Sequence, residues 1–215
     1  MNENFVINIG RQLGSGGHEV GLLLAAALNI DFYDKELIEM ASEKSGLAKG
    51  LFEKMDEKTG RSMIHGIFSM HSGVNNEVYA GNYLCNETLF KIQSDVIREL
   101  AEKKSCLFVG RCADYILRDN ERVVNVFIAA DPSDRVKRVM QKQGLTAEKA
   151  EELIEKTDKK RSGYYNFYSN KVWGAAESYH LCINTSALGI EGTVNLVRHF
   201  VEEKLKLKAC DKARS

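Results

Sequence analysis

The sequence predicts an α/β protein of three layers, in which helices cover both faces of a five-stranded parallel sheet. Two observations support this prediction. Short apolar runs alternate with longer segments of helical spacing, and consecutive residues in each run are apolar, as in strands buried on both faces. The expected strands span residues 5–9, 30–33, 105–109, 123–130 and 180–184. In such sheets, ligands bind beyond the carboxyl ends of the strands.

The expected helices follow these strands along the chain. A glycine-rich segment, 10–17, ends the first strand and leads into a helix rich in leucine and alanine. After the fourth strand, Asp131 is expected to cap a helix, and Pro132 suits its first position. Segment 60–86 shows no clear period and predicts an irregular excursion. The other helices are expected at 17–29, 35–45, 47–58, 87–103, 146–161 and 189–207.

The composition limits the classes of function. The chain has 215 residues, which suits a single domain, and is 44% hydrophobic and 28% charged, as in soluble globular proteins. Its formal net charge is zero, which argues against a dedicated nucleic-acid binder. The longest apolar-leaning stretch, 20–30, is too short to cross a bilayer, and the first residues do not resemble a signal peptide. We therefore expect a cytoplasmic protein with no nucleic-acid or membrane partner.

The cysteines and histidines do not suggest a disulfide framework or a metal site. The five cysteines are an odd number without a Cys-x-x-Cys pair, which argues against disulfides and structural zinc. The four histidines beyond residue 60 lack metal-ligand spacing, so no metal site made of protein side chains is predicted. Cys106 and Cys182 lie in apolar runs and are expected to be reduced and buried.

The segment between the first strand and the first helix has the composition of an anion-binding loop. Gly14, Ser15, Gly16 and Gly17 lie where the amides of a turn and a helix N-terminus converge on phosphate oxygens. The full phosphate-loop pattern G-x-x-x-x-G-K-[ST] is not matched, because Gly17 replaces the lysine and His18 follows it. A tight turn without a ligand is the alternative interpretation of this loop.

Six segments along nearly the whole chain resemble the cytidylate kinase-like family. They are residues 7–20 (INIGRQLGSGGHEV), 32–38 (FYDKELI), 109–117 (VGRCADYIL), 127–130 (FIAA), 158–161 (DKKR) and 183–186 (INTS). The resemblance implies the phosphate-loop (P-loop) NTPase-like fold of nucleoside monophosphate kinases, with ATP and Mg²⁺ as cofactors. It also implies an acceptor-binding insertion at about 35–86 and a helical lid at about 140–172, within one domain spanning 1–215.

The resemblance also implies an acceptor site. In cytidylate kinases, a Gly-Arg-Asp segment after the third strand places the arginine on the acceptor phosphate and the aspartate on the cytosine. Arg111 keeps the first role here, but Cys112 replaces the aspartate and cannot accept from an exocyclic amine as a carboxylate does. Asp114 is the candidate to compensate. Met40 stands where a further acceptor-binding arginine is expected.

Further positions match the family's lid and adenine-binding segments. Asp158 and Arg161 have the Asp-x-x-Arg spacing that contacts the acceptor sugar and phosphate, with a solvated ion pair as the alternative. Arg135 and Arg138 resemble lid arginines that lie against the adenine or its phosphates, with a solvated helix face as the alternative. Asn184 begins a segment similar to the loop behind the adenine, and an ordinary turn is the alternative there.

Polar residues near the glycine loop complete the candidate site. Asp34 is expected to hold a magnesium-bound water or to orient the attacking oxygen, or else to cap the helix that follows. His18 is expected near a phosphate, whereas Glu19 is expected to be exposed. Arg11 is the candidate to replace the missing lysine, because a guanidinium can hold two phosphate oxygens at once.

Two functions are compatible with this sequence. The first is an ATP-dependent kinase that acts on a cytidylate-like nucleoside monophosphate or on a related small molecule. Its catalytic residues would be Arg11, Asp34 and Arg111. The second is a non-catalytic nucleotide- or phosphate-binding module with a degenerate loop. The aromatic segment from Tyr164 to Trp173 is expected to pack the lid on the core, with an aromatic floor for a base as the alternative. The oligomeric state is left open, a homodimer included.

Overall fold

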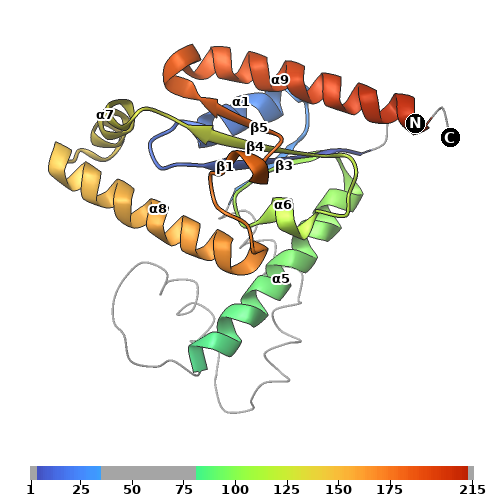
Figure 1. Cartoon of the computed structure of the whole chain (residues 1–215), viewed down its shortest axis with the longest axis horizontal. Coiled ribbons are helices and arrows are strands. Elements are labelled where there is room, and N and C mark those ends of the chain that lie inside the picture. The colour runs from blue at the N-terminus through green and yellow to red at the C-terminus, as the bar shows by residue number, and fades with distance from the viewer. Residues whose placement is uncertain (1–3, 35–80, 213–215) are drawn as a thin grey trace. The chain divides into compact units, whose positions relative to one another are not determined.

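The computed structural model describes residues 4–34 and 81–212, which contain a five-stranded sheet with helices on both of its faces (Figure 1). The chain divides into two compact units, Met1–Lys35 with Arg98–Ser215 and Glu36–Ile97. The sheet lies in the first unit. The helices expected at 35–45 and 47–58, and most of the excursion expected at 60–86, lie outside the described residues.

The sheet is entirely parallel, with strand order β2-β3-β1-β4-β5. Its strands are β1 (Val6–Arg11), β2 (Asp31–Tyr33), β3 (Cys106–Val109), β4 (Val123–Ala129) and β5 (Leu181–Asn184). The predicted fold class is therefore confirmed, down to the number of strands. Every strand ends at the same edge of the sheet, as parallel strands must, and the segments that follow β1 and β3 meet there.

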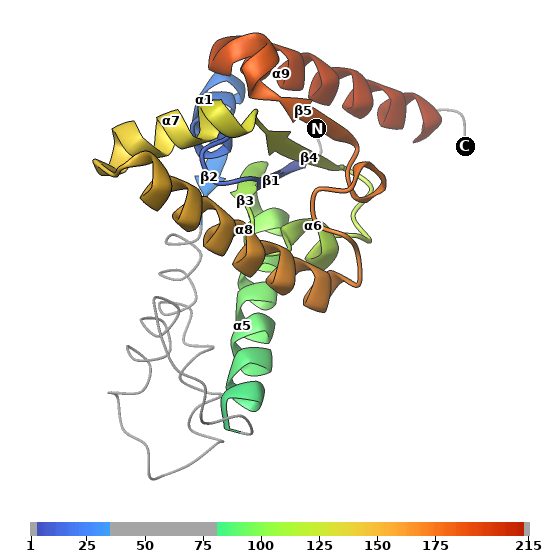
Figure 2. The ribbon, with the colours of Figure 1, turned by 60° about the vertical axis from the view of Figure 1, so that its left-hand side comes forward.

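The helices form the outer layers. They are α1 (Gly17–Leu28), α5 (Gly81–Lys103), α6 (Ala113–Ile116), α7 (Pro132–Gln143), α8 (Ala147–Ser169) and α9 (Thr185–Lys212), with a 3-10 turn η2 at Ala176–Ser178. Helices α1 and α9 pack together on one face of the sheet, and α6 and α8 lie on the opposite side (Figures 1 and 2). Within residues 4–34 and 81–212, no helix has the length and apolarity that a bilayer crossing requires.

Helices α5, α8 and α9 are longer than the sequence predicts, and α9 spans Thr185–Lys212 where residues 189–207 were expected. Helix α8 continues eight residues beyond Arg161, because Tyr165 and Ser169 are buried and anchor its last two turns. At its start, the Thr146 side chain accepts a hydrogen bond from the Lys149 amide. Helix α5 begins at Gly81 rather than at about residue 87. Local periodicity misses such extensions because tertiary packing sets where a helix ends.

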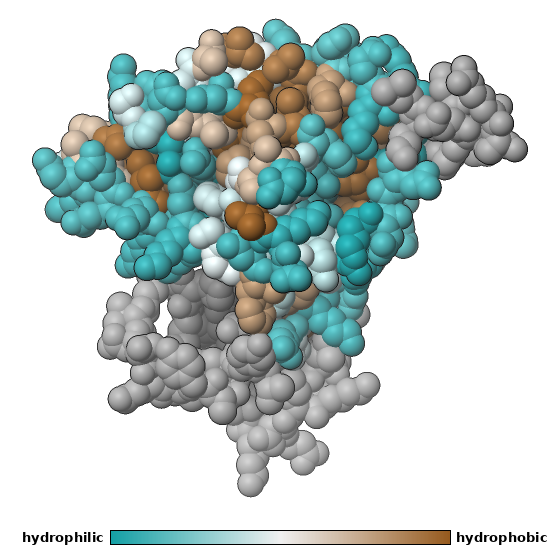
Figure 3. Space-filling view, in the orientation of Figure 1, coloured by the Kyte–Doolittle hydropathy of each residue, from teal (hydrophilic) through white to brown (hydrophobic). Residues whose placement is uncertain are grey.

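Two of the detailed expectations are wrong. Asp131 occupies the cap position of α7, but its side chain makes no capping bond and instead accepts from Asn184 Nδ2 at 2.7 Å. Cys106 is buried, and burial raises the pKa of its thiol to about 12, but Cys182 is exposed. Cys182 is exposed because β5 is the edge strand of the sheet. Figure 3 shows apolar side chains on the visible surface near β5 and α9.

The two faces of the sheet differ in chemistry. Side chains alternate between faces along a strand. Ile7, Val124, Val126 and Ile128 belong to the aliphatic core that α1 and α9 complete, and Ile7 and Ile128 have no exposed surface.

The alternate positions face the other way. Asn8 and Asn125 are register partners on β1 and β4, and Asn8 Nδ2 donates to Asn125 Oδ1 at 2.9 Å. On the same strand as Asn125, Phe127 packs its ring against Trp173 and Tyr179, with centroids 5.1 and 5.0 Å away. This second face, which is polar and aromatic, leads to the candidate site.

Candidate functional site

The glycine loop between β1 and α1 has the left-handed backbone that glycine permits. Gly14 and Gly16 have φ angles of 77° and 78°, and a Cβ at Gly14 would lie 2.6 Å from the Arg135 carbonyl oxygen. Between them, Ser15 is fully buried. Its hydroxyl donates to the Gln12 carbonyl at 2.9 Å and accepts from the Gly17 amide at 3.3 Å. Ser15 thus supports the loop from below and lines neither of the cavities described next.

Three side chains from two other elements, α7 and α9, hold the carbonyl oxygens of the loop. Arg135 Nε donates to Leu13 O at 2.8 Å, Arg138 Nη1 to Gly14 O at 2.5 Å, and Thr185 Oγ1 to Ser15 O at 2.8 Å. The first amides of α1 have no intrahelical acceptor, as at any helix N-terminus. The loop therefore keeps its carbonyls satisfied on the protein side while the helix end retains donors for an anion.

A cavity opens on this loop. Of the residues expected to bind a nucleotide, Gly14, Gly16, Gly17, His18 and Arg138 line it. It is also lined by Arg11, Gln12, Leu13, Glu19, Val139, Lys142, Gln143 and Arg161. Lys142 and Gln143 come from the last turn of α7, to which the sequence reasoning assigned no role.

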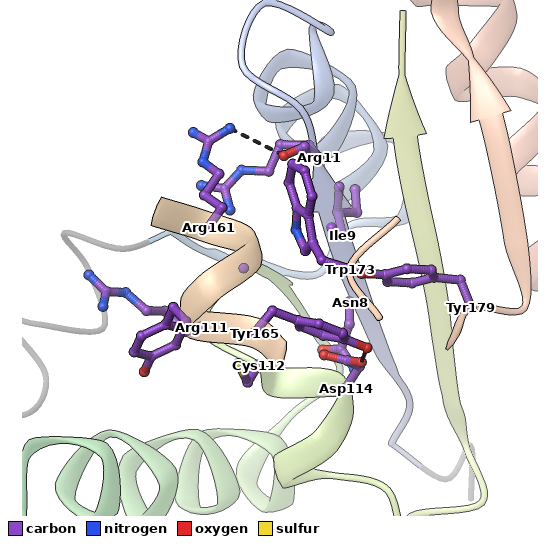
Figure 4. A pocket seen from close by; sticks show the side chains of 13 residues that line it. Asn8, Ile9, Arg11, Arg111, Cys112, Asp114, Arg161, Tyr165, Trp173 and Tyr179 are labelled. Atoms are coloured by element: carbon purple, nitrogen blue, oxygen red, sulfur yellow. Dashed lines mark hydrogen bonds between the residues drawn. The ribbon is translucent and has the colours of Figure 1, made fainter. Parts of the chain in front are cut away.

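A second cavity lies at the carboxyl ends of β1 and β3 beside α8 (Figure 4). Arg11, Arg111 and Arg161 line it from three different elements. Its remaining lining is aromatic and polar: Asn8, Ile9, Gly10, Gly110, Cys112, Asp114, Tyr164, Tyr165, Trp173 and Tyr179. The alternative interpretation of Tyr164–Trp173 as part of a binding site is therefore compatible with the structure, although these rings also pack α8 on the sheet.

Arg11 and Arg161 line both cavities. The Arg11 side chain passes close to two glycines: a Cβ at Gly17 would lie 2.5 Å from Arg11 Cβ, and one at Gly110 would lie 2.2 Å from Arg11 Nη1. Arg161 Nη1 donates to the Arg11 carbonyl at 3.2 Å (Figure 4). Burial, followed by repulsion from Arg161 and Arg111, lowers the pKa of Arg11 to about 9. Positive charge thus accumulates where the cavities meet, in excess of what nearby carboxylates balance.

The turn after β3 is strained. Gly110, Arg111 and Cys112 all have positive φ, at 83°, 60° and 54°. Left-handed backbone costs a non-glycine residue about 1–2 kcal/mol, so the two side chains are held here at an energetic cost that is common at binding sites. The Arg111 guanidinium lies 5.9 Å from the centroid of the Tyr164 ring. Burial raises the pKa of the Cys112 thiol, so this residue is neutral and does not replace a carboxylate.

Asp114 lies inside the second cavity but is already hydrogen-bonded. Its Oδ2 accepts from the Tyr165 hydroxyl at 2.7 Å, and burial raises the pKa of its carboxyl group (Figure 4). Burial also raises the pKa of Tyr165, which keeps the phenol protonated as the donor. Asp114 therefore has the position expected of a compensating carboxylate, but one of its oxygens already accepts a hydrogen bond from Tyr165 of α8.

Asp158 supports the loop instead of facing the acceptor cavity. Its Oδ1 accepts from the Leu13 amide at 2.8 Å, and Oδ2 pairs with Arg135. The expected ion pair with Arg161 is present at 3.8 Å. The expected contact with an acceptor does not agree with this placement, because the carboxylate is committed to α7 and the glycine loop.

Besides Ser15, four of the expected site residues lie outside the two cavities. Of the described side chains, Asp34, Arg135, Asp158 and Asn184 line neither one. Asp34 Oδ2 lies 3.2 Å from Nε2 of His18, which is in the first turn of α1. Asn184 donates to Asp131 and accepts from the Ser186 amide at 2.9 Å, as in an ordinary Asn turn.

Two residues of the second cavity were missed from the sequence. Asn8 carried a signal, since an amide in the middle of an apolar strand needs a partner or a purpose. Tyr179 carried none, because it lies in an irregular segment before β5 and only the fold brings it to the cavity.

The described residues provide few ligands for a cation of their own. Among them, no group of three or more His, Cys, Asp or Glu side chains could hold a metal ion. Glu19 lines the glycine-loop cavity and is exposed, as expected. A magnesium ion at this loop would therefore be held largely by nucleotide phosphates, which is how Mg²⁺ usually binds in kinase sites.

A parallel sheet with a glycine loop at its edge and arginine-lined cavities defines a protein of the P-loop kinase fold class. The chain belongs to the cytidylate kinase-like family, whose family model matches residues 6–187. No curated protein matches the chain.

Solved structures agree with the fold. An uncharacterized protein from Eubacterium ventriosum ATCC 27560 is 28% identical, with a TM-score of 0.71 over 93% of this chain and 99% of that one. A shikimate kinase from Bacteroides thetaiotaomicron is 16% identical, with a TM-score of 0.51 over 92% and 98%. A gluconokinase from Sinorhizobium meliloti 1021 is 10% identical, with a TM-score of 0.56 over 98% and 99%. The last two show similarity of fold alone.

Proposed function

We propose that this protein is an ATP-dependent kinase that transfers a phosphoryl group to a nucleoside monophosphate or a related small anionic acceptor. The observation that carries the proposal is the pair of cavities joined by Arg11 and Arg161. Phosphoryl transfer needs donor and acceptor in line, with positive charge at the transferred group. Two cavities that share two guanidinium groups offer that arrangement.

Each cavity has a distinct part in this reaction. The polyphosphate of ATP, with its Mg²⁺, lies on the N-terminus of α1, where backbone amides and Arg138 line the first cavity. The acceptor occupies the second cavity, with its anionic group toward Arg111. Asp34 remains the candidate to orient the attacking oxygen or a magnesium-bound water, and its bond to His18 places it beside the glycine loop.

Arg11 takes the place of the missing lysine in this proposal. A cation at the transferred phosphoryl group is worth about 10³–10⁵ in rate, or about 4–7 kcal/mol of barrier. Arg11 is charged, partly buried and shared by the two cavities. Its pKa is lowered first by burial and then by repulsion from Arg161 and Arg111, and an anion would relieve that repulsion.

A non-catalytic nucleotide- or phosphate-binding module is the second candidate. It is favoured by the commitment of Asp158 and Arg135 to the glycine loop, which leaves fewer side chains for an acceptor than the family pattern implies. Such a module would bind ATP or an inorganic polyphosphate on the loop without turnover.

A coupled ADP-release assay with ATP and Mg²⁺ tests the proposal. The acceptors are CMP, dCMP, UMP and AMP, together with the hydroxylated carboxylates gluconate and shikimate, and ATP binding is measured by calorimetry in parallel. Turnover with one of these acceptors, absent without it, is the expected result. ATP binding without any acceptor-dependent ADP release would overturn the kinase and support the module.

A further inference from the structure

Asn8 has a hydrogen-bond acceptor that the protein leaves unused. The side chain is 4% exposed, and it lies in the middle of β1 on the polar face of the sheet. Its amide nitrogen donates to Asn125, but its carbonyl oxygen is buried and has no partner. Buried acceptors are nearly always satisfied in folded proteins, so an unsatisfied one needs an explanation. Because Asn8 lines the second cavity, a ligand there could supply the missing donor.

The hydroxyl of Tyr179 repeats this pattern in the same cavity. It is buried and lies near the Tyr165 hydroxyl and the Gly174 amide, without meeting hydrogen-bond geometry with either. The ring is held by Phe127 and by a stack on Tyr165 at 6.0 Å. Aromatic packing thus fixes where this unpaired hydroxyl lies (Figure 4).

The cavity is therefore polarised along its length. Three arginines, Arg11, Arg111 and Arg161, provide positive charge on one side. On the other side of the cavity, Asn8 and Tyr179 provide neutral polar atoms without partners. The Asp114 carboxylate lies next to them and already accepts a hydrogen bond from Tyr165. A molecule with an anionic group at one end and a neutral hydrogen-bond donor at the other complements both sides.

We propose that Asn8 and Tyr179 determine the specificity of the second cavity by reading a neutral amino or hydroxyl group at the end of the acceptor remote from its anionic group. This inference rests on the proposed function in that it calls the ligand of the second cavity the acceptor. The binding that it describes does not require turnover. An exocyclic amine on a base and a hydroxyl on a small carboxylate share this chemistry. Asn8 Oδ1 accepts from either one, and the Tyr179 hydroxyl contributes the second contact.

The first experiment measures binding with matched probes. Calorimetry compares CMP, which carries an amine, with UMP, which carries a carbonyl in its place, and compares shikimate with benzoate, which lacks hydroxyls. We expect the probe with the donor to bind at least about tenfold more tightly within at least one pair, since one buried hydrogen bond is worth about that factor. The pair that discriminates identifies the source of the donor. Equal affinity within both pairs, or no binding by any probe, would overturn the inference.

The second experiment uses variants. Asn8→Leu removes the acceptor and should abolish the discrimination. Asn125→Leu breaks the same Asn–Asn bond from the side that lies outside the cavity lining, so it is the matched control and should keep the discrimination. A loss of discrimination in both variants would assign Asn8 a structural role only.

Tyr179→Phe keeps the inference testable if the asparagine variants fail to fold. It removes an unpaired buried hydroxyl and leaves the ring packing in place, so the melting temperature should stay the same or rise while the probe with the donor binds several-fold more weakly. A structural hydroxyl would give the opposite result, a lower melting temperature with unchanged binding. Binding that depends on Tyr179 without any ADP release would keep this inference and reject the kinase. Turnover that is indifferent to Asn8 and Tyr179 would do the reverse.

Discussion

The two faces of the central sheet differ in what they contact: one packs into the aliphatic core, and the other lines a cavity. Toward α1 and α9, β1 and β4 present Ile7, Val124, Val126 and Ile128, which pack into a continuous aliphatic core. Toward α6 and α8, the same two strands present Asn8, Asn125 and Phe127, and the space above them is only partly filled. One face maximises buried apolar surface, and the other gives up some of that stabilisation to keep polar groups in place.

This difference teaches where stability and function are separated in the molecule. An apolar side chain gains free energy in proportion to the area it removes from water, whatever its neighbours are. A buried amide gains nothing until it finds a partner, and costs about 1–3 kcal/mol while it lacks one. Among the described residues of the cavity, Asn8 and Tyr179 keep polar atoms without partners, and we take the face that they line as the functional one. The four predictions below test this division.

The largest effect is expected from Arg11→Gln, at the end of β1 where the polar cavities meet. Loss of the guanidinium should lower kcat about 10³-fold or more, because it removes charge from the transferred group. Stability should not fall, since the charge on Arg11 is already opposed by burial and by Arg161. Turnover measurements and urea unfolding check both statements, with the exposed arginine variant Arg118→Gln as the control. Full activity in Arg11→Gln would mean that another group supplies the cation.

The aliphatic face should respond in the opposite sense. Ile7→Ala leaves a cavity in a fully buried site and should destabilise the protein by about 2–5 kcal/mol, while the folded fraction keeps its ligand preference. Urea unfolding and the CMP/UMP comparison give the two readouts. Leu22→Ala, at a side chain that is half exposed, should change stability by less than about 0.5 kcal/mol. A changed ligand preference in Ile7→Ala would erase the distinction between the faces.

A smaller effect is expected where α8 supports the glycine loop. Asp158→Asn removes the charge that pairs with Arg135 and should cost about 1–3 kcal/mol, because the arginine stays largely buried. The affinity for ATP should fall with it, since asparagine can still accept from the Leu13 amide but turns an amide group, and no longer a carboxylate oxygen, toward the Arg135 that holds the loop. Glu155→Gln, at an exposed residue about one turn earlier on α8, is the matched variant for unfolding and calorimetry. Equal results for the two variants would remove Asp158 from the support of the loop.

The smallest effect is a proton count. Arg11 has a pKa of about 9, below its ordinary value, so folding disfavours its charged form and stability should rise as the pH increases above 9. A bound polyanion favours the charged form and raises this pKa. At pH 9, binding of ATP should therefore take up about half a proton per site. Calorimetry in two buffers of different ionisation enthalpy measures the uptake, and Arg11→Gln should show none.

Much of the architecture could be predicted from the sequence because it depends on local pattern. Consecutive apolar residues predicted the five strands, and the glycine cluster at 14–17 predicted a loop whose positive φ angles only glycine adopts easily. Arg11, Arg111 and the glycine loop could be expected at one edge of the sheet, since parallel strands bring their carboxyl ends together. Arg161, on α8, lines the same two cavities as Arg11, and its place there depends on how α8 packs. The end of α8 at Ser169 and the start of α5 at Gly81 were not predicted. At Ser169, burial of the last turns rather than periodicity sets the end of the helix.

Which polar residues support the glycine loop and which line the cavities depends on contacts between segments far apart in the chain. Asp158 and Arg135 match a ligand-binding pattern, yet each finds its partner in the other and in Leu13, more than a hundred residues earlier. In the sequence, Asn8 stands out only as an amide within an apolar strand, and Tyr179 does not stand out at all. The fold buries both side chains and leaves one polar atom of each without a hydrogen-bond partner. Periodicity and spacing report which side chains a chain can bury. Whether a buried polar atom is satisfied depends on what the rest of the fold brings within about 3 Å of it.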